Sequence, residues 1–296
     1  MVLHRYILHN DRIHEASDTV LAPGQVGLLS GWGVFTTLKV SDGVPFAFER
    51  HWARISRDAA AMHVPLPGNP EGLRQRLLEL VEANHAYHST LRLVIVRNGG
   101  GMWAGPSNGR ASDVIALTAD SKDWGEGVKL GIVPHSRYAA CEFTTTKILS
   151  WAMNLTWVES AQQRGLDEVI LLNEFGDVAE CTSANIFVST GGQVWTPPVS
   201  SGCLPGITRE VLLNEIHVQG IQISEKILTP ADLEAADEVF ITSTTRNLLP
   251  VREIEGKSIG RTDSTRHALA EAFGEYVDRY VAAHKTAALL GPGRQS

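Results

Sequence analysis

The sequence is short of cysteine and has no long apolar run, no internal repeat and no low-complexity tract. Its three cysteines, Cys141, Cys181 and Cys203, are widely spaced, which indicates a reducing compartment and argues against a disulfide framework. A run of about 18 apolar residues, the length that a transmembrane helix requires, does not occur. The first residues also lack the apolar core of a secretory signal. We therefore expect a cytoplasmic protein that does not enter a membrane.

Basic residues are outnumbered by acidic ones, and the formal net charge is −7. A chain of this charge has no broad attraction for nucleic acid or anionic lipid, so we expect neither as a partner. The cysteine spacing is not that of a metal site, and we predict no bound metal. What remains is an ordinary globular composition of 296 residues, 43% hydrophobic and 20% charged, enough for one large domain or two of usual size.

The first part of the chain mixes strand patterns with two amphipathic helices. Four segments are rich in strand-forming side chains: residues 2–8, 34–40, 91–97 and 114–118. Apolar residues recur at helical spacing over 49–62 and 71–84. Turn residues at 41–43 predict a hairpin into a short strand at 45–48. The glycine-rich stretch at 98–101 is expected to be a loop rather than a phosphate cradle, because no helix pattern follows it.

Residues 120–127 are polar, and we place the domain junction there. After it, strand patterns occur at 128–133, 168–172, 178–180, 186–188, 194–196, 221–225 and 238–242, and helix patterns at 150–163, 208–216 and 263–284. The elements do not alternate strictly as βαβ units, so an α+β or mixed α/β fold is expected. The predicted division is a smaller domain at 1–119, an interdomain loop at 120–127, a larger domain at 128–290 that carries Lys147, and a tail at 291–296.

Lys147 lies in a mostly neutral segment, after three threonines and before an apolar, helix-like run. A lysine enclosed by such neighbours loses hydration, which lowers its pKa and makes the neutral amine available as a nucleophile. Amines of this kind form Schiff bases with carbonyl compounds, including pyridoxal phosphate. The alternative is a lysine whose stem packs while its ammonium group reaches water. The motifs before and after Lys147 decide between the two.

Those motifs extend, in a characteristic order and spacing, over nearly the whole chain. They lie at residues 31–35, 49–55, 144–150, 178–187, 203–210, 243–245 and 248–251. Together they resemble the class IV, or fold type IV, pyridoxal-phosphate enzymes, which include branched-chain aminotransferases, D-amino-acid aminotransferases and aminodeoxychorismate lyase. The resemblance implies a two-domain D-amino-acid aminotransferase-like fold and pyridoxal 5'-phosphate as cofactor. It also implies a homodimer in which a loop of the partner chain completes each pocket.

The resemblance assigns the chemistry to two residues. Lys147 would form the Schiff base with the cofactor and, once substrate displaces it, move the α-proton as a neutral base. Glu180 begins the pattern Glu-x-x-x-x-Asn-hydrophobic-Phe and would keep the pyridine nitrogen protonated, which makes the ring an electron sink.

The resemblance also assigns the phosphate contacts. Arg54 would present the rigid donor fork of its guanidinium group, for which a solvated helix arginine is the alternative. The amides of Ile207 and Thr208 would bind the phosphate at a helix start, a role compatible with Thr208 as a helix cap. Thr244 would add its hydroxyl or amide.

The segment at 203–210 resembles the branched-chain enzymes most. We therefore expect transfer of an amino group between a branched-chain or other hydrophobic amino acid and a 2-oxo acid such as 2-oxoglutarate. Three departures from that subgroup occur: Ala152 replaces a tyrosine, residues 243–245 replace a Gly-Thr-Ala turn, and residues 35–37 replace Phe-Glu-Gly. Residues 35–37 and 180–185 instead resemble aminodeoxychorismate lyase, which eliminates pyruvate and releases 4-aminobenzoate; that reaction is the alternative.

For the substrate, we expect contacts from Phe35 and Thr245, and a carboxylate-binding role for Arg97 or Arg137, with plain surface roles as the alternative. A D-amino-acid aminotransferase is disfavoured because no Arg-x-His carboxylate trap follows the strand at 91–97. A non-catalytic module with the same fold would lack one of the cofactor residues. All of them are present, namely Arg54, Lys147, Glu180 and Thr208.

Overall fold

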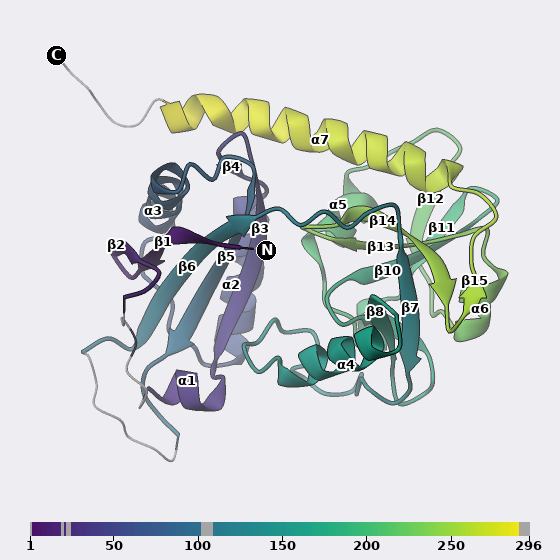
Figure 1. The fold of residues 1–296 in the computed structure, drawn as a ribbon, viewed down its shortest axis with the longest axis horizontal. Helices are drawn as coiled ribbons and strands as arrows, with labels where there is room; N and C mark the ends of the chain where they lie inside the picture. The colour runs from purple at the N-terminus through teal and green to yellow at the C-terminus, as the bar shows by residue number, and fades with distance from the viewer. Residues whose placement is uncertain (1, 19–20, 22–24, 102–108, 290–296) are drawn as a thin grey trace. The chain divides into compact units, whose positions relative to one another are not determined.

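The computed structural model describes residues 2–18, 21, 25–101 and 109–289 (Figure 1). It divides into two compact units, and the mixed α/β fold class expected from the sequence is confirmed. Unit 1 consists of Met1–Lys122, Thr146–Ser150 and Val277–Ser296, and unit 2 of Asp123–Thr145 and Trp151–Tyr276. The tail predicted at 291–296 lies outside the described residues. Among the residues that are described, no helix is both long and apolar enough to cross a membrane.

Unit 1 is built on a six-stranded antiparallel sheet with strand order β2-β1-β6-β5-β3-β4. The strands are β1 (Leu3–His9), β2 (Arg12–Glu15), β3 (Gly33–Ser41), β4 (Val44–Pro45), β5 (Ser89–Arg97) and β6 (Ser112–Asp120). The helices that begin in this part of the chain are α1 (Val26–Ser30), α2 (Phe48–Ala61) and α3 (Pro70–Ala83).

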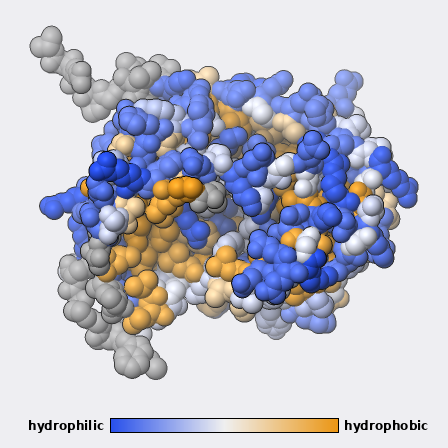
Figure 2. Space-filling view, viewed as in Figure 1, coloured by the Kyte–Doolittle hydropathy of each residue, from blue (hydrophilic) through white to orange (hydrophobic). Residues whose placement is uncertain are grey.

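The core of unit 1 lies between its sheet and the helices α2 and α3. Alternate residues of β5, such as Leu91 and Leu93, are buried in this core together with Ile55 and Leu77 from the helices. Because successive strand side chains point to opposite faces, the residues between them lie on the other side of the sheet. Val94 on that side is only half-buried, and Figure 2 shows apolar surface over this face.

The strand expected at 45–48 is much shorter than predicted. Strand β4 ends at Pro45, and helix α2 begins at Phe48. Between them Ala47 has φ 53°, a left-handed conformation that stops the strand and turns the chain into the helix. Side-chain composition carries no signal for such a turn at an alanine.

Unit 2 contains a nine-stranded mixed sheet with the order β12-β11-β10-β13-β14-β7-β8-β9, in which β15 also pairs with β14. The strands are β7 (Val128–Val133), β8 (Glu168–Leu172), β9 (Val178–Cys181), β10 (Asn185–Thr190), β11 (Gln193–Thr196), β12 (Gln222–Glu225), β13 (Glu238–Ser243), β14 (Asn247–Ile254) and β15 (Lys257–Ser258). Their core centres on buried apolar side chains such as Ile186 and Ile241. Phe187 and Phe240 stack with ring centroids 5.2 Å apart.

The remaining helices are α4 (Ala152–Gln163), the 3₁₀ helix η1 (Val199–Ser201), α5 (Ile207–Asn214), α6 (Pro230–Ala235) and α7 (Ser264–Leu289). Helix α6 and strand β14 were not predicted. The signal for α6 was present, because Thr229 and Asp232 form a capping box around a proline at the helix start. Strand β14 contains Pro250, whose missing N–H argues against a strand paired on both sides.

The two units differ from the predicted domains in two places. The chain first passes from unit 1 to unit 2 at Lys122, inside the interdomain loop predicted at 120–127. However, the segment Thr146–Ser150 with Lys147 groups with unit 1, whereas the sequence placed it in the larger C-terminal domain. Residues from Val277 onward also group with unit 1. The segment Thr146–Ser150 groups with unit 1 because its backbone is hydrogen-bonded to strand β3.

Candidate active site

The segment that carries Lys147 is hydrogen-bonded to strand β3. Phe35 N donates to Lys147 O, and Leu149 N donates to Gly33 O, both at 3.0 Å. Gly33 allows this close approach, because a Cβ there would lie 2.5 Å from Ile95 O and from Leu149 Cδ1. Lys147 is therefore attached to strand β3 through its own carbonyl oxygen and through the amide of Leu149, two residues later.

Asp58 of α2 fixes the same backbone from a second direction. Its buried carboxylate accepts a hydrogen bond from Lys147 N at 3.0 Å and another from Arg57 Nη2 at 2.6 Å. The side-chain nitrogen Nζ of Lys147 lies 4.6 Å from the centroid of the Phe35 ring. A carboxylate thus orients the lysine backbone, and an aromatic ring lies beside its amine.

We expect Asp58→Ala to lower the free energy of unfolding by about 1–3 kcal/mol, because Lys147 N–H loses its acceptor. Asp58→Asn keeps an oxygen at the same place and is expected to lose less. Urea denaturation of the purified variants measures both. The control is Glu71→Ala, which removes an exposed carboxylate on α3 and is expected to change the free energy by less than about 0.5 kcal/mol. Equal stability of Asp58→Ala and the unaltered protein would contradict this role.

Arg54 and His51 share one hydroxyl group in the interior of unit 1. Arg54 Nη2 donates to Thr36 Oγ1 at 2.9 Å, and Thr36 Oγ1 lies 2.6 Å from His51 Nδ1. Burial lowers the pKa of His51 well below its ordinary value, and the positive charges of Arg54 and Lys147 lower it further. A neutral imidazole and a threonine therefore orient the arginine for which phosphate binding is predicted.

Glu180 lies on β9 of unit 2 and is buried, and each of its carboxylate oxygens has a donor. Arg137 Nη2 donates to Oε1, and Leu204 N donates to Oε2 at 3.0 Å. The carboxylate is therefore held in one orientation with a guanidinium group beside it. A fixed anion of this kind suits the predicted contact with a protonated pyridine nitrogen.

The start of helix α5 is anchored to strand β10 by Asn185. Asn185 Nδ2 donates to Leu204 O at 2.8 Å, and a Cβ on Gly206 would lie 2.1 Å from Asn185 Oδ1. Ile207 and Thr208 follow as the first buried residues of the helix. The N–H groups of a first helical turn have no partners within the helix, so this turn is suited to an anion.

The hairpin between β13 and β14 carries Thr244 and Thr245. Arg246 N donates to Ser243 O at 3.2 Å and closes the turn. Asn185 pairs with Thr242 in the sheet register, so the hairpin lies at the same end of the sheet as the start of β10. Three candidate anchors of unit 2, namely Glu180, the first turn of α5 and the Thr244 hairpin, are therefore at one end of the sheet.

The structure places the predicted residues in two groups, one in each unit. Unit 1 holds Phe35, Arg54, Arg97 and Lys147, and unit 2 holds Arg137, Glu180, Ile207, Thr208, Thr244 and Thr245. Both arginines proposed for a substrate carboxylate have partners within their own unit. Arg97 donates to the carbonyl oxygens of His63 and Gly99 and lies over the ring of Trp32, while Arg137 binds Glu180.

Asp58 and Arg92 were not predicted as site residues. Asp58 shares the buried face of α2 with His51 and Ile55, and an acidic residue at helical spacing from buried apolar residues was the available signal. Arg92 lies on β5 between Leu91 and Leu93 and so points to the opposite face of the sheet. Its Cζ is 4.1 Å from the centroid of Phe35, the ring that also lies beside the Lys147 amine.

The donor set fits pyridoxal phosphate, the cofactor that the resemblance implies. A buried carboxylate fixed by Arg137 is available for the pyridine nitrogen, and Lys147 for the aldehyde. The helix start behind Gly206, where even a Cβ would clash, offers backbone amides to a phosphate group. No group of three or more His, Cys, Asp or Glu side chains that would hold a metal ion occurs within the described part of the chain.

Comparison with known proteins agrees with this chemistry. The profile of the family described as amino-transferase class IV matches residues 33–254. The chain is 31% identical over 258 residues to the D-alanine aminotransferase of Bacillus licheniformis, covering 86% of this chain and 90% of that protein. It is also 31% identical over 253 residues to a putative branched-chain-amino-acid aminotransferase of Methanocaldococcus jannaschii, covering 84% and 88%. The solved branched-chain amino acid aminotransferase of Escherichia coli has a TM-score of 0.82 at 26% identity, covering 93% of this chain and 94% of that one.

Proposed function

Because the chain belongs to the class IV aminotransferases, we propose that it transfers an amino group between a branched-chain or other hydrophobic amino acid and a 2-oxo acid such as 2-oxoglutarate. The family consists of enzymes that use pyridoxal 5'-phosphate. When bound, this cofactor supplies the electron sink that stabilises the charge left by removal of the α-proton.

In this proposal the residues divide the work among proton transfer, the pyridine contact and the phosphate contacts. Lys147 removes the proton from the α-carbon of the substrate and returns a proton later, so its amine is neutral when it acts. Glu180 provides a fixed negative charge at the pyridine nitrogen. The phosphate is bound by Arg54, by the amides of Ile207 and Thr208, and by Thr244.

The choice of substrate rests on one observation, the two basic side chains that flank Phe35. Arg92 is partly buried, which lowers the pKa of its guanidinium group, and none of the described carboxylates forms an ion pair with it. An amino acid and a 2-oxo acid both bring a carboxylate, which is the partner that such a cation lacks. The Phe35 ring offers apolar surface to a hydrophobic side chain. Lys147 lies beside the same ring, where the substrate amine would react.

Half-reactions with a panel of amino acids test the proposal. Leucine, isoleucine and valine in their L forms are expected to convert the bound cofactor to its amino form, with loss of the visible absorption band. D-alanine is expected to react at least about tenfold more slowly, a difference of about 1.4 kcal/mol in the barrier. Faster reaction with D-alanine would overturn the substrate choice. Pyruvate and 4-aminobenzoate from aminodeoxychorismate, without an amino acceptor, would establish the lyase instead.

Replacement of Arg92 tests the carboxylate contact. We expect Arg92→Ala to raise the KM for 2-oxoglutarate by about 10–100-fold with a smaller effect on kcat, because a hydrogen-bonded charge pair with substrate is lost. Steady-state kinetics at varied 2-oxoglutarate measures the change. Arg97→Ala is the matched control on the same strand, since Arg97 binds backbone carbonyl groups. A KM that rises equally in both variants would contradict the assignment.

We further propose a homodimer. Support comes from the half-buried apolar residues on the face of the unit 1 sheet that lies outside its core, namely Val94, Ile115 and Leu117. An uncovered apolar face of this kind is typical of an interface. Light scattering during gel filtration is expected to give twice the chain mass of 32.2 kDa, and a monomer would contradict the proposal. The cytoplasmic location stays a prediction.

A further inference from the structure

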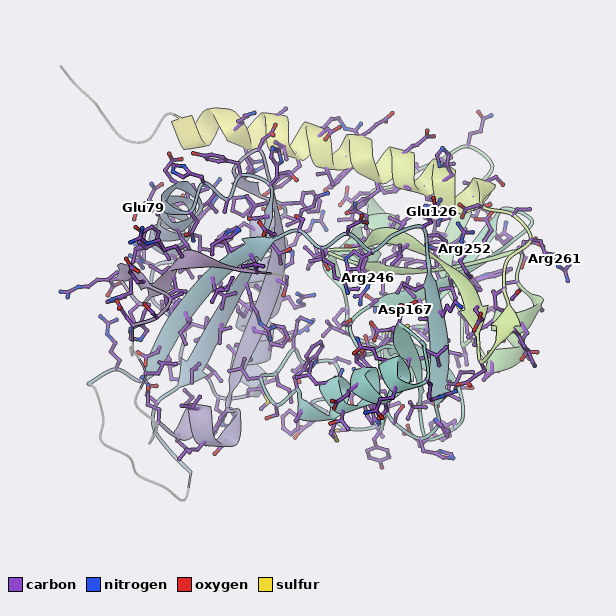
Figure 3. All side chains as sticks on the ribbon, viewed as in Figure 1. Glu79, Glu126, Asp167, Arg246, Arg252 and Arg261 are labelled. Carbon is purple, nitrogen blue, oxygen red and sulfur yellow. The ribbon has the colours of Figure 1, made fainter. Side chains whose placement is uncertain are left out.

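A buried ion pair in unit 2 joins two side chains to which no role has been assigned so far. Arg246 Nη2 is 2.8 Å from Glu168 Oε2, and the side chains are 6% and 1% exposed. The Arg246 guanidinium also lies over the ring of Trp124, with Cζ 3.9 Å from the centroid. Figure 3 labels Arg246 among the side chains of this unit. Burial lowers the pKa of Arg246 and raises that of Glu168, while their attraction opposes both shifts.

Glu168 binds the loop that follows Glu180 in the chain. The hydroxyl of Thr182 donates to Glu168 Oε1, and that of Ser183 donates to Oε2 at 2.8 Å. Arg246 reaches the same loop, because its Nη1 donates to Ser183 O at 3.2 Å. Both members of the ion pair therefore hold the connection between β9 and β10, which starts two residues after Glu180.

Arg246 itself belongs to the hairpin that carries Thr244. Its backbone N–H donates to Ser243 O and to Ser243 Oγ, both at 3.2 Å, so its position is coupled to the conformation of the turn. The guanidinium group at the other end of the residue is bonded to Glu168 and to Ser183. One side chain thus links the hairpin of Thr244 to the loop behind Glu180.

We infer that Arg246 and Glu168 are positioning residues that set the separation between the pyridine contact at Glu180 and the phosphate contact at Thr244. The inference rests on the proposed cofactor-binding roles of those two residues. The ring nitrogen and the phosphate of the cofactor are a fixed distance apart, so two anchors on separate loops bind it well only when their separation is also fixed. A buried pair with hydrogen bonds to both loops provides that constraint.

Variants of the ion pair can separate this positioning role from a general effect on stability. Removing one member leaves the other charge buried and unpaired, which destabilises a protein strongly, whereas replacing both members by apolar residues often restores stability. The double variant Arg246→Met/Glu168→Leu is therefore expected to fold with a melting temperature close to that of the unaltered protein. It still lacks the side-chain bonds by which Arg246 links the hairpin to Glu168 and to Ser183 of the loop. Its cofactor affinity reports positioning alone.

The experiment starts from purified holoenzyme, removes the cofactor, and measures the Kd for pyridoxal phosphate and the melting temperature of each apo form. We expect Arg246→Met and the double variant to bind at least about tenfold more weakly. Arg246→Lys keeps the charge but not the fork of two bonds, and is expected to be intermediate. Phosphorus NMR of the reloaded variants is expected to show a shifted phosphate resonance.

Arg266→Met is the matched control. Arg266 is a largely buried arginine of unit 2 that pairs with Asp263 and donates to Leu248 O on strand β14, but bonds neither the turn that carries Thr244 nor the loop behind Glu180. Its loss is therefore expected to lower the melting temperature without changing the Kd more than about twofold. Unchanged cofactor affinity in the folded double variant, or in Arg246→Lys if the double variant does not fold, would overturn the inference and leave the proposed function standing. Failure of the unaltered protein to bind the cofactor would instead overturn the proposed function.

Discussion

Lys147→Ala is expected to reduce kcat for transamination by at least about 10³-fold. The substitution removes the only amine assigned to the cofactor and the base that moves the α-proton, and a positioned base alone contributes about 10²–10⁴-fold. Rapid-mixing measurement of the half-reaction with L-leucine reports the proton-transfer step without product release. The variant is expected to keep its fold, because Phe35 and Gly33 of β3 bind the backbone of this segment and not the lysine side chain.

Lys39→Ala is the control for this prediction. Lys39 lies on β3 in the same unit and is half-buried, as Lys147 is, and burial lowers the pKa of its amine, but it has no proposed role. Its loss is expected to change kcat by less than about twofold. Turnover by Lys147→Ala at the rate of Lys39→Ala would show that another group is the base.

Glu180→Gln is expected to lower kcat by about 10²-fold or more. The substitution keeps the size of the side chain and an oxygen for Leu204 N–H but removes the charge that would keep the pyridine nitrogen protonated. It also leaves Arg137 without its anionic partner. The half-reaction with L-leucine and the absorption spectrum of the bound cofactor at several pH values measure the loss.

Glu174→Gln serves as the comparison for Glu180→Gln. Glu174 is also in unit 2 and accepts hydrogen bonds from the backbone of Ala139 and Ala140, which lower its pKa. Because it lies outside the proposed cofactor contacts, its substitution is expected to leave the half-reaction within about twofold of the unaltered rate. A similar rate loss in the two variants would mean that the effect of Glu180→Gln is structural.

Many of the helices and strands could be predicted from local sequence patterns. The strands β7 and β8 lie where the sequence placed them, because short segments rich in Val, Ile and Leu mark them. Strand β14 was not predicted because Pro250 lacks the N–H that a strand paired on both sides would use. The sequence placed Lys147 in the other unit because its position depends on pairing with the distant strand β3. Pairing between distant segments leaves no periodic signal in either segment.

The same limit applies to the candidate site. Lys147, Glu180 and Arg54 could be predicted as site residues because residue type and motif order point to them. Arg92 was not predicted as a site residue, because an arginine inside a strand is expected to be exposed until its neighbours are known. The partners that orient the predicted residues, such as Asp58 for Lys147, are separated from them by many residues in sequence and become visible only in the folded chain.

Borohydride reduction of the holoenzyme, followed by mass spectrometry of its peptides, tests the central claim most directly. Reduction fixes the cofactor permanently to the amine that holds it. The account predicts one cofactor adduct per chain, on the peptide that contains Lys147, with loss of activity in proportion to labelling. An adduct on Lys39 or on any other lysine, or reduced protein that stays active without a label on Lys147, would contradict it.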